Sequence, residues 1–277
     1  MLRKLAVLGS PIEHSKSPAI HTAAYRVLGL NWEYEKIEVR KGGLKPFAEA
    51  LTPDWLGLSL TMPLKEEAAR FAESLNPAAE LTEAVNTLMR TESGWAGYNT
   101  DVFGIAQALR LAGISKPASV LIIGSGATAT SAVTAIGEMN SDAQILVYAR
   151  NPKTRGELVS FAKSLGLKAK SARSIKSTGK KVALTIATLP GGALDEEAAK
   201  LARKNFVPAG ALLDVAYSPW PSAFAGVWHS AHKPIISGLE MLLWQAIGQI
   251  RIFQNGSPDQ PLLNEVAVVE AMRHALD

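Results

Sequence analysis

Apolar residues along the chain are spaced in two ways, either consecutively or three to four positions apart, and segments of the two kinds alternate. Short continuous apolar runs, such as those within residues 4–9 and 119–124, predict strands, whereas apolar residues three or four positions apart predict helices. The two kinds of segment alternate along the whole chain, which predicts an α/β protein. Further predicted strands cover residues 32–39, 57–61, 84–91, 95–99, 144–150, 182–188 and 210–217, and predicted helices include 102–113, 129–139, 238–253 and 264–276.

The same pattern predicts two domains. The run at 119–124 holds four consecutive apolar residues at 120–123, as in a strand of a buried parallel sheet, and it begins a second strand–helix series. We therefore expect an N-terminal α/β substrate domain of residues 1–103 and 238–277, to which the C-terminal helices return. Residues 104–237 are expected to form a Rossmann-like dinucleotide-binding domain.

Composition excludes several classes of site. The 277 residues include no cysteine, so a disulfide framework, a thiol nucleophile and a cysteine-ligated metal are excluded, and the five histidines are scattered. No apolar run reaches the roughly 18 residues of a membrane span. The N-terminus lacks the longer apolar region of a signal peptide. We expect a cytoplasmic protein with neither a metal nor a membrane partner.

The net charge of +4 is too small to argue for a nucleic-acid partner, but it is unevenly distributed. Residues 150–181 hold ten Lys or Arg and one acid, Glu157. This basic segment is either a solvated surface or a surface that steers an anionic ligand toward its site.

The segment IIGSGATATSA, residues 122–132, has the G-x-G-x-x-A spacing of a dinucleotide-binding turn. It follows the buried strand and opens a helix, which is the context that this motif requires. Gly124 would make the tight turn, Gly126 would let the backbone approach a pyrophosphate, and Ala129 would allow close packing of helix on strand. Dinucleotide binding is the favoured interpretation, and a merely structural turn is the alternative.

The end of the next strand indicates which dinucleotide binds. An NAD site usually has an acidic residue here, which takes the ribose 2′-hydroxyl. This chain has YARNPKTR instead, and Arg150, Lys153 and Arg155 are suited to a 2′-phosphate. The pattern favours NADP over NAD.

The N-terminal half carries the remaining candidate chemistry. Ser15 and Ser17 stand two positions apart before a helix expected to start near Pro18; they either bind a carboxylate or, more simply, Ser17 caps the helix. In SLTMPLKEE, Lys65 falls in the first turn of a helix expected after Pro63, where the macrodipole disfavours a cation by roughly 0.3–1 kcal/mol. Helical spacing continues there through Leu64, Ala68, Phe71, Ala72 and Leu75.

Eight segments resemble the shikimate dehydrogenase family, in the order in which that family has them. They are GSPIEHSKSPAIH (9–21), SLTMPLK (59–65), AVNT (84–87), GYNTD (97–101), GSGATATSA (124–132), ARN (149–151), DVAY (214–217) and GLEMLLWQ (238–245). They span nearly the full length, and as a set they are highly specific. The resemblance implies a reversible reduction of 3-dehydroshikimate by NADPH, which gives shikimate.

The resemblance also implies roles for individual residues. Lys65 and Asp101 would form the catalytic pair, and Ser15, Ser17 and Tyr217 would hold the substrate carboxylate. Thr61, Asn86, Asp101 and Gln245 would contact the ring hydroxyls and the reacting end. Expected cofactor contacts are Gly124, Ser125, Gly126, Ala127, Thr128, Arg150, Asn151, Lys153, Arg155, Thr188, Val215, Gly238 and Met241.

The sequence departs from the family pattern at several positions. The family often has Asn where Ser59 stands, His-Asn where His21-Thr22 stands, and Gly where Glu83 stands. It usually has a second glycine where Ala127 stands, and the loop IATLPGGALD (186–195) carries an inserted Leu189. None of these changes removes a residue with an expected chemical role.

Two alternatives remain open beside an NADP-dependent shikimate dehydrogenase. One is a quinate/shikimate dehydrogenase that uses NAD, against which Arg150 argues. The other is a non-catalytic NADP-binding sensor on the same scaffold, against which the retention of Lys65 and Asp101 argues. The expected assembly is a monomer or a homodimer.

Overall fold

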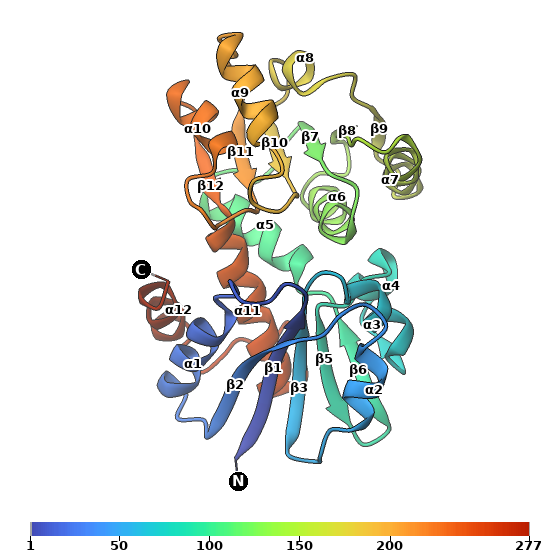
Figure 1. Ribbon diagram of the computed structural model, residues 1–277, viewed down its shortest axis with the longest axis vertical. Helices are drawn as coiled ribbons and strands as arrows, with labels where there is room; N and C mark the ends of the chain where they lie inside the picture. The colour runs from blue at the N-terminus through green and yellow to red at the C-terminus, as the bar shows by residue number, and fades with distance from the viewer. Residues whose placement is uncertain (1, 277) are drawn as a thin grey trace. The chain divides into compact units, whose positions relative to one another are not determined.

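The computed structural model describes residues 2–276 and divides the chain into two compact units. The first comprises Met1–Gly104 and Leu242–Asp277, and the second comprises Ile105–Met241. The two boundaries fall inside helices α5 (Asp101–Leu111) and α11 (Gly238–Asn255). Each unit has its own sheet and its own core (Figure 1).

The first unit is built on a mixed six-stranded sheet in the order β2-β1-β3-β5-β6-β4. Its strands β1, β2 and β3 are mutually parallel where they pair, whereas β5 runs antiparallel to both β3 and β6. The strands are β1 (Arg3–Gly9), β2 (Trp32–Glu38), β3 (Trp55–Leu60), β4 (Ser74–Leu75), β5 (Thr87–Thr91) and β6 (Gly94–Tyr98).

Helices cover both faces of this sheet, and the alternation along β1 shows how. Leu5 and Val7 pack into the core formed with α1 (Ser17–Val27), α11 and α12 (Glu265–His274). Ala6 and Leu8 point the other way, into the core formed with the shorter helices. These are α2 (Leu44–Glu49), α3 (Lys65–Phe71) and α4 (Pro77–Thr82), seen on the opposite side of the sheet in Figure 1.

The strand directions place four connections at one edge of the first sheet. Because β1 and β3 are parallel, both end at the same edge. Because β5 is antiparallel to β3 and β6 is antiparallel to β5, the beginning of β5 and the end of β6 meet at that edge too. The segments after β1, after β3, before β5 and after β6 therefore gather there, and they include all the expected substrate residues of this unit except Gln245.

The second unit has an entirely parallel sheet in the order β12-β11-β10-β7-β8-β9. The chain starts in the middle at β7, winds outward through β8 and β9, and returns to wind the other way, which is the doubly wound Rossmann order. The α/β fold class is confirmed. Strands are β7 (Ser119–Ile123), β8 (Gln144–Tyr148), β9 (Lys168–Ser171), β10 (Leu184–Ala187), β11 (Ala211–Asp214) and β12 (Ile235–Ser237); helices are α6 (Ala127–Met139), α7 (Pro152–Ser164), α8 (Ile175–Gly179), α9 (Asp195–Arg203) and α10 (Ala223–Ser230).

The helix that begins at Lys65 is shorter than its apolar spacing predicts. It ends at Phe71, and Ala72 is already extended with φ −67° and ψ 139°. The next residues pair with β6 as strand β4, and the side chain of Leu75 reaches the core beside Gly97, where a Cβ would lie 2.8 Å from it. Leu75 thus has an apolar environment in a strand, so helical spacing alone was misleading here. Pro63 also lies outside the helix, two residues before its first residue.

Within residues 2–276, none of the helices combines the length and the apolar character of a membrane span.

The predicted domain boundaries, after residues 103 and 237, lie within a few residues of the boundaries between the two compact units.

Candidate active site

Lys65 is the first residue of α3 and lies at the sheet edge described above. The turn before it is closed by the Leu64 N–H, which donates to the Thr61 carbonyl at 2.9 Å. The Lys65 ammonium forms an ion pair with the Asp101 carboxylate. Their side chains are 14% and 4% exposed, so this pair is largely removed from water and from the screening that weakens surface ion pairs.

Asp101 is the first residue of α5. Its backbone N–H donates to the side-chain oxygen of Asn99 at 2.9 Å. The Asp101 carboxylate is free to face Lys65, and the N-terminus of α5 favours its negative charge.

Asn86 lies between these residues and α11. Its side-chain amide donates to Asp101 Oδ1 at 2.8 Å and to Thr100 Oγ1 at 2.9 Å, and its side-chain oxygen accepts from the Thr100 N–H at 2.9 Å. The same amide lies 3.4 Å from Gln245 Oε1. Asn86 is buried, and its orientation is determined by these partners. The structure thus brings together Lys65, Asp101, Asn86 and Gln245.

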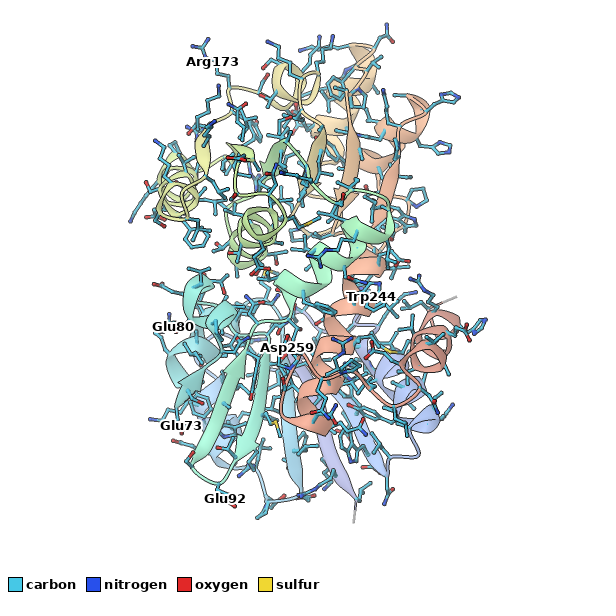
Figure 2. All side chains as sticks on the ribbon, turned by 180° about the vertical axis from the view of Figure 1, so that it is seen from behind. Glu73, Glu80, Glu92, Arg173, Trp244 and Asp259 are labelled. Atoms are coloured by element: carbon cyan, nitrogen blue, oxygen red, sulfur yellow. The ribbon has the colours of Figure 1, made fainter. Side chains whose placement is uncertain are left out.

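The packing of α5 against α11 places Gln245 at this cluster. The ring of Trp244, labelled in Figure 2, contacts that of Phe103 edge to face at a centroid distance of 6.4 Å. One residue further along α11, the Gln245 carbonyl accepts from the Thr100 hydroxyl at 2.9 Å. Thr100 was not anticipated from the sequence, although it stands next to Asp101 in the motif GYNTD.

Thr61 lies beside the end of β1. Its N–H donates to the Leu8 carbonyl at 2.9 Å. A Cβ at Gly9 would overlap the Thr61 methyl group and lie 2.9 Å from the Met62 carbonyl oxygen. Gly9 is therefore required for the close approach of the Thr61 loop to the start of the serine-containing segment.

Ser15 and Ser17 lie at the N-terminus of α1, but Ser17 does not cap it. The helix begins at Ser17 itself, no side chain caps its first turn from the N-cap position, and Ser15 Oγ accepts from the Ser17 N–H at 3.3 Å. The simple capping interpretation of Ser17 is therefore wrong. The predicted role of the two hydroxyls in binding a carboxylate remains a prediction.

In the second unit, the glycine-rich turn has the conformation that the motif requires. Gly124 follows β7 with φ +119°, and a Cβ there would overlap the Thr188 hydroxyl. Thr188 follows β10, the neighbouring strand, and donates to the Ile123 carbonyl at 2.9 Å. Because β7 and β10 lie where the winding direction reverses, these residues mark the position where doubly wound folds bind ligands. Next, Gly126 precedes α6, and nothing lies within 4 Å of a Cβ built on it.

The basic residues after β8 are arranged unequally. Arg150 and Lys153 are exposed, whereas Arg155 folds back so that its Nη1 lies 3.4 Å from the Ala149 carbonyl. The Nε of Arg155 is buried and has no hydrogen-bond partner among the described residues. Asn151 caps α7 by accepting from the Lys153 N–H at 2.9 Å, so its side-chain oxygen already has a structural partner.

Two of the expected cofactor contacts, Val215 and Gly238, lie together. A Cβ at Gly238 would overlap the Val215 carbonyl and lie 2.9 Å from the Asp214 carbonyl, so Gly238 is required where α11 begins beside the end of β11. Met241, one turn further along α11, is buried.

Asp214, in the segment DVAY, is a buried carboxylate for which the sequence pattern indicates no role. Burial raises its pKa, while hydrogen bonds from Ser222 Oγ (2.6 Å) and the Ala216 N–H (3.1 Å) lower it. These bonds hold the loop that carries Tyr217, whose pKa is also raised by burial. Tyr217 belongs to the second unit, so its expected contact with the substrate carboxylate stays a prediction.

An ammonium, a carboxylate and two carboxamides thus converge at one sheet edge. Together these four side chains can bind hydroxyl groups, stabilise negative charge on an oxygen atom and transfer a proton to that oxygen. Among the described residues, no group of three or more His, Cys, Asp or Glu side chains is placed to hold a metal ion.

Comparison with known proteins gives a consistent set of relatives. Residues 7–88 match the family model of the shikimate dehydrogenase substrate binding domain. Shikimate dehydrogenase (NADP(+)) from Thermus thermophilus is 31% identical over 271 residues, which cover 96% of this chain and 98% of that protein.

Solved structures of shikimate dehydrogenases are also similar to this chain. A crystal structure of Mycobacterium tuberculosis shikimate dehydrogenase has a TM-score of 0.85 and 36% identity, with 99% of this chain and 98% of that chain covered. The Thermus thermophilus shikimate 5-dehydrogenase in complex with NADP(H) and shikimate has a TM-score of 0.82 and 29% identity, with 99% of each chain covered.

Proposed function

Because this chain belongs to the shikimate dehydrogenase family, we propose that it catalyses the reversible reduction of 3-dehydroshikimate to shikimate with NADPH, a step in the biosynthesis of aromatic amino acids. The observation that carries the proposal is the ion pair of Lys65 with Asp101, which Asn86 holds from the other side of the carboxylate. The ion pair joins an ammonium and a carboxylate that are 36 residues apart in the sequence, and this pairing supports the proposed reaction.

Lys65 is the proton donor in the direction of reduction. When a carbonyl carbon accepts a hydride, its oxygen gains negative charge and must be protonated. The Lys65 ammonium stabilises that charge and supplies the proton. Asp101 orients the ammonium, and the 2.8 Å bond from Asn86 orients Asp101.

The substrate contacts follow from the same edge. Ser15 and Ser17, at the start of α1, bind the substrate carboxylate. Tyr217, in the second unit, is a further ligand of this carboxylate that the family resemblance implies. Thr61, Asn86, Asp101 and Gln245 contact the ring hydroxyls. The hydroxyl and amide groups of this set can both donate and accept hydrogen bonds, which suits a polyhydroxylated ring.

The residues of the second unit fit NADP. Gly126 leaves open space at the start of α6, where a pyrophosphate would meet backbone N–H groups, and Arg150 and Lys153 present exposed cations to a 2′-phosphate. Ser125, Ala127 and Thr128 belong to the same turn. Thr188, Val215, Gly238 and Met241 would border the rest of the dinucleotide. When bound, NADPH supplies the hydride.

The assembled Lys65–Asp101 pair argues against the non-catalytic sensor, and Arg150 in place of an acid argues against an NAD-dependent quinate/shikimate dehydrogenase. We further propose that the protein acts in the cytoplasm, as a monomer or a homodimer.

A steady-state assay separates these functions. The purified protein is mixed with shikimate or quinate and with NADP⁺ or NAD⁺, and formation of the reduced nicotinamide is followed by absorbance. We expect the highest kcat/KM for shikimate with NADP⁺. A preference for NAD⁺ with comparable turnover of quinate would replace the proposal by the quinate/shikimate alternative, and binding of NADP⁺ without turnover would support the sensor.

A further inference from the structure

A buried polar network lies beneath the candidate active site and is not used by the mechanism above. At its centre is Gln249 on α11, only 2% exposed. Its Nε2 donates to the Asn86 carbonyl at 3.0 Å. Its Oε1 accepts from Ser59 Oγ at 2.9 Å and from His21 Nε2 at 3.2 Å. One amide therefore joins α11 to β3, to α1 and to the residue that precedes β5.

The outer members of the network fix the direction of these bonds. Tyr34 Oη donates to Ser59 Oγ at 2.6 Å, so the Ser59 proton is available for Gln249. Tyr25 Oη lies 3.0 Å from His21 Nδ1, so the Nε2 proton of a neutral His21 points to Gln249. Burial lowers the pKa of His21 to about 3, which keeps the ring neutral. With this arrangement, each polar group of Gln249 has a partner.

Gln249 is a polar residue in an otherwise apolar part of α11. The residues of α11 on either side of it, Leu243, Ala246, Ile247 and Ile250, are fully buried in an apolar core. Apolar contact is not directional, so it tolerates small shifts of a helix on a sheet, whereas a buried hydrogen-bonded residue specifies one register. Gln249 lies one helical turn after Gln245, on the same face of α11.

We propose that Gln249 is a positioning residue of the active site: its amide fixes α11 and the Asn86 backbone relative to each other, so that Gln245 and Asn86 meet and Asn86 holds Asp101. This inference rests on the proposed function for its kinetic test, but not for its structural one. It also gives Ser59 a role, since the family often has Asn at that position and this chain uses the serine to orient Gln249.

The test compares two variants that break the same hydrogen bond. Gln249→Met keeps the length of the side chain and removes its bonds to His21, Ser59 and Asn86. His21→Phe removes the bond to Gln249 Oε1 and keeps a ring against Tyr34, with which His21 stacks at a centroid distance of 3.9 Å, while the bond from Gln249 to Asn86 stays in place. Both changes lower the melting temperature, but only the first affects Asn86.

The kinetic expectation follows from the size of the hydrogen bonds involved. In Gln249→Met, kcat/KM for shikimate should fall about tenfold, since the bond to the Asn86 carbonyl is lost together with those to Ser59 and His21. The KM for NADP⁺ should remain within about twofold of the wild-type value, because Gln249 lies in the other unit. His21→Phe should retain wild-type kinetic constants within about twofold at a temperature where it is folded. Equal kinetics of all three proteins, or equal losses in both variants, would reduce Gln249 to a structural residue and overturn the proposal.

A ligand-free measurement decides the proposal independently of activity. In ¹⁵N–¹H spectra, the side-chain amide signal of Asn86 should shift or broaden in Gln249→Met and stay in place in His21→Phe. An unchanged Asn86 signal in Gln249→Met would overturn the proposal even if the wild type proved inactive toward shikimate. Should Gln249→Met fail to fold, Gln249→Glu takes its place, because its carboxylate keeps the acceptors for Ser59 and His21 and loses the donor to Asn86.

Discussion

At the scale of single residues, the position of Lys65 is explained by its partner. A cation in the first turn of a helix is disfavoured by roughly 0.3–1 kcal/mol. The adjacent acids Glu66 and Glu67 suit that turn, but Glu67 also accepts from the N–H groups of Gly42 (2.8 Å) and Leu44 (3.1 Å), at the start of α2. The direct compensation for Lys65 is its ion pair with Asp101, which lies at the start of another helix.

The serine pair gives a prediction about substrate binding. The double substitution Ser15→Ala with Ser17→Ala removes both hydroxyls. At the start of α1 it costs the bond from the Ser17 N–H to Ser15 Oγ (3.3 Å), but no N-cap bond, since none is formed there. We expect KM for shikimate to rise strongly while the affinity for NADP⁺, measured by fluorescence titration, stays nearly constant. Unchanged KM would show that these serines do not bind the carboxylate.

His21 gives a prediction about stability and pH. Its pKa is lowered by burial to about 3, whereas in the unfolded chain it is about 6.5. Between these values the unfolded state binds a proton that the folded state does not, so the stability contributed by neutral His21 falls as the pH drops from 6.5 toward 3. The slope is about 1.4 kcal/mol per pH unit.

Thermal unfolding of the wild type and of His21→Phe at pH 7 and pH 5 measures this contribution. Carboxylates titrate in both proteins, so the difference between them isolates His21. The advantage of the wild type in melting temperature should shrink or reverse at pH 5. The same advantage at both pH values would contradict the neutral, buried state of His21.

At the scale of elements, the sequence predicts the parts whose signals are local. The strands at β1, β7 and β8 have long apolar runs, and the helices α6, α11 and α12 have sustained helical spacing, so their existence could be read directly. The pairing of Lys65 with Asp101 could also be predicted, from the resemblance of SLTMPLK and GYNTD to the motifs of the family, whereas the catalytic role of the pair stays a prediction.

Other features depend on contacts between distant residues and leave no local signal. Strand β4 has two residues, Ser74 and Leu75, and exists because β6 offers it a partner. The polar strand β9 lies at the edge of its sheet and lacks an apolar run. Gln249 donates to a carbonyl 163 positions earlier, so nothing around it in the sequence distinguishes it from an ordinary helix residue.

The glycine-rich turn gives a prediction that separates conformation from binding. Gly124→Ala places a Cβ against Thr188 at φ +119°, which should cost roughly 1–3 kcal/mol of stability. Gly126→Ala meets nothing within 4 Å at φ −94°, so the free protein should lose less than about 0.5 kcal/mol.

The affinity of the two glycine variants for NADPH provides the second half of this prediction. Gly126→Ala should weaken NADPH binding about tenfold despite its normal stability, since the added methyl group lies where the pyrophosphate would approach the backbone. Melting curves and NADPH titrations of the two variants provide the data. Normal NADPH affinity in Gly126→Ala would contradict the assignment of the turn to the pyrophosphate.

At the scale of the whole molecule, the uneven charge predicts a salt effect. The basic segment 150–181 spans α7, β9 and α8, and Arg173 projects outward from it in Figure 2. If this segment steers the cofactor, its attraction acts on the extra phosphate of NADPH and is screened as salt rises.

We therefore expect kcat/KM for NADPH to fall more steeply than that for NADH between low and high salt, in steady-state assays with saturating 3-dehydroshikimate. The assay with NADH serves as the internal control, since both cofactors share the same pyrophosphate and nicotinamide. Parallel salt curves would leave the basic segment as a solvated surface.

The central claim is that Lys65 supplies the proton of the reaction, and the kcat of Lys65→Ala tests it most directly. Removal of a general acid costs roughly 10²–10⁴-fold, so kcat should fall by that factor while KM for shikimate stays within a few-fold and NADP⁺ still binds. Lys65→Arg should not restore turnover, because a guanidinium hardly releases a proton, and Lys45→Ala, at an exposed lysine paired with Glu49, should behave as wild type. A near-normal kcat in Lys65→Ala, with only KM raised, would contradict the account and make Lys65 a binding residue.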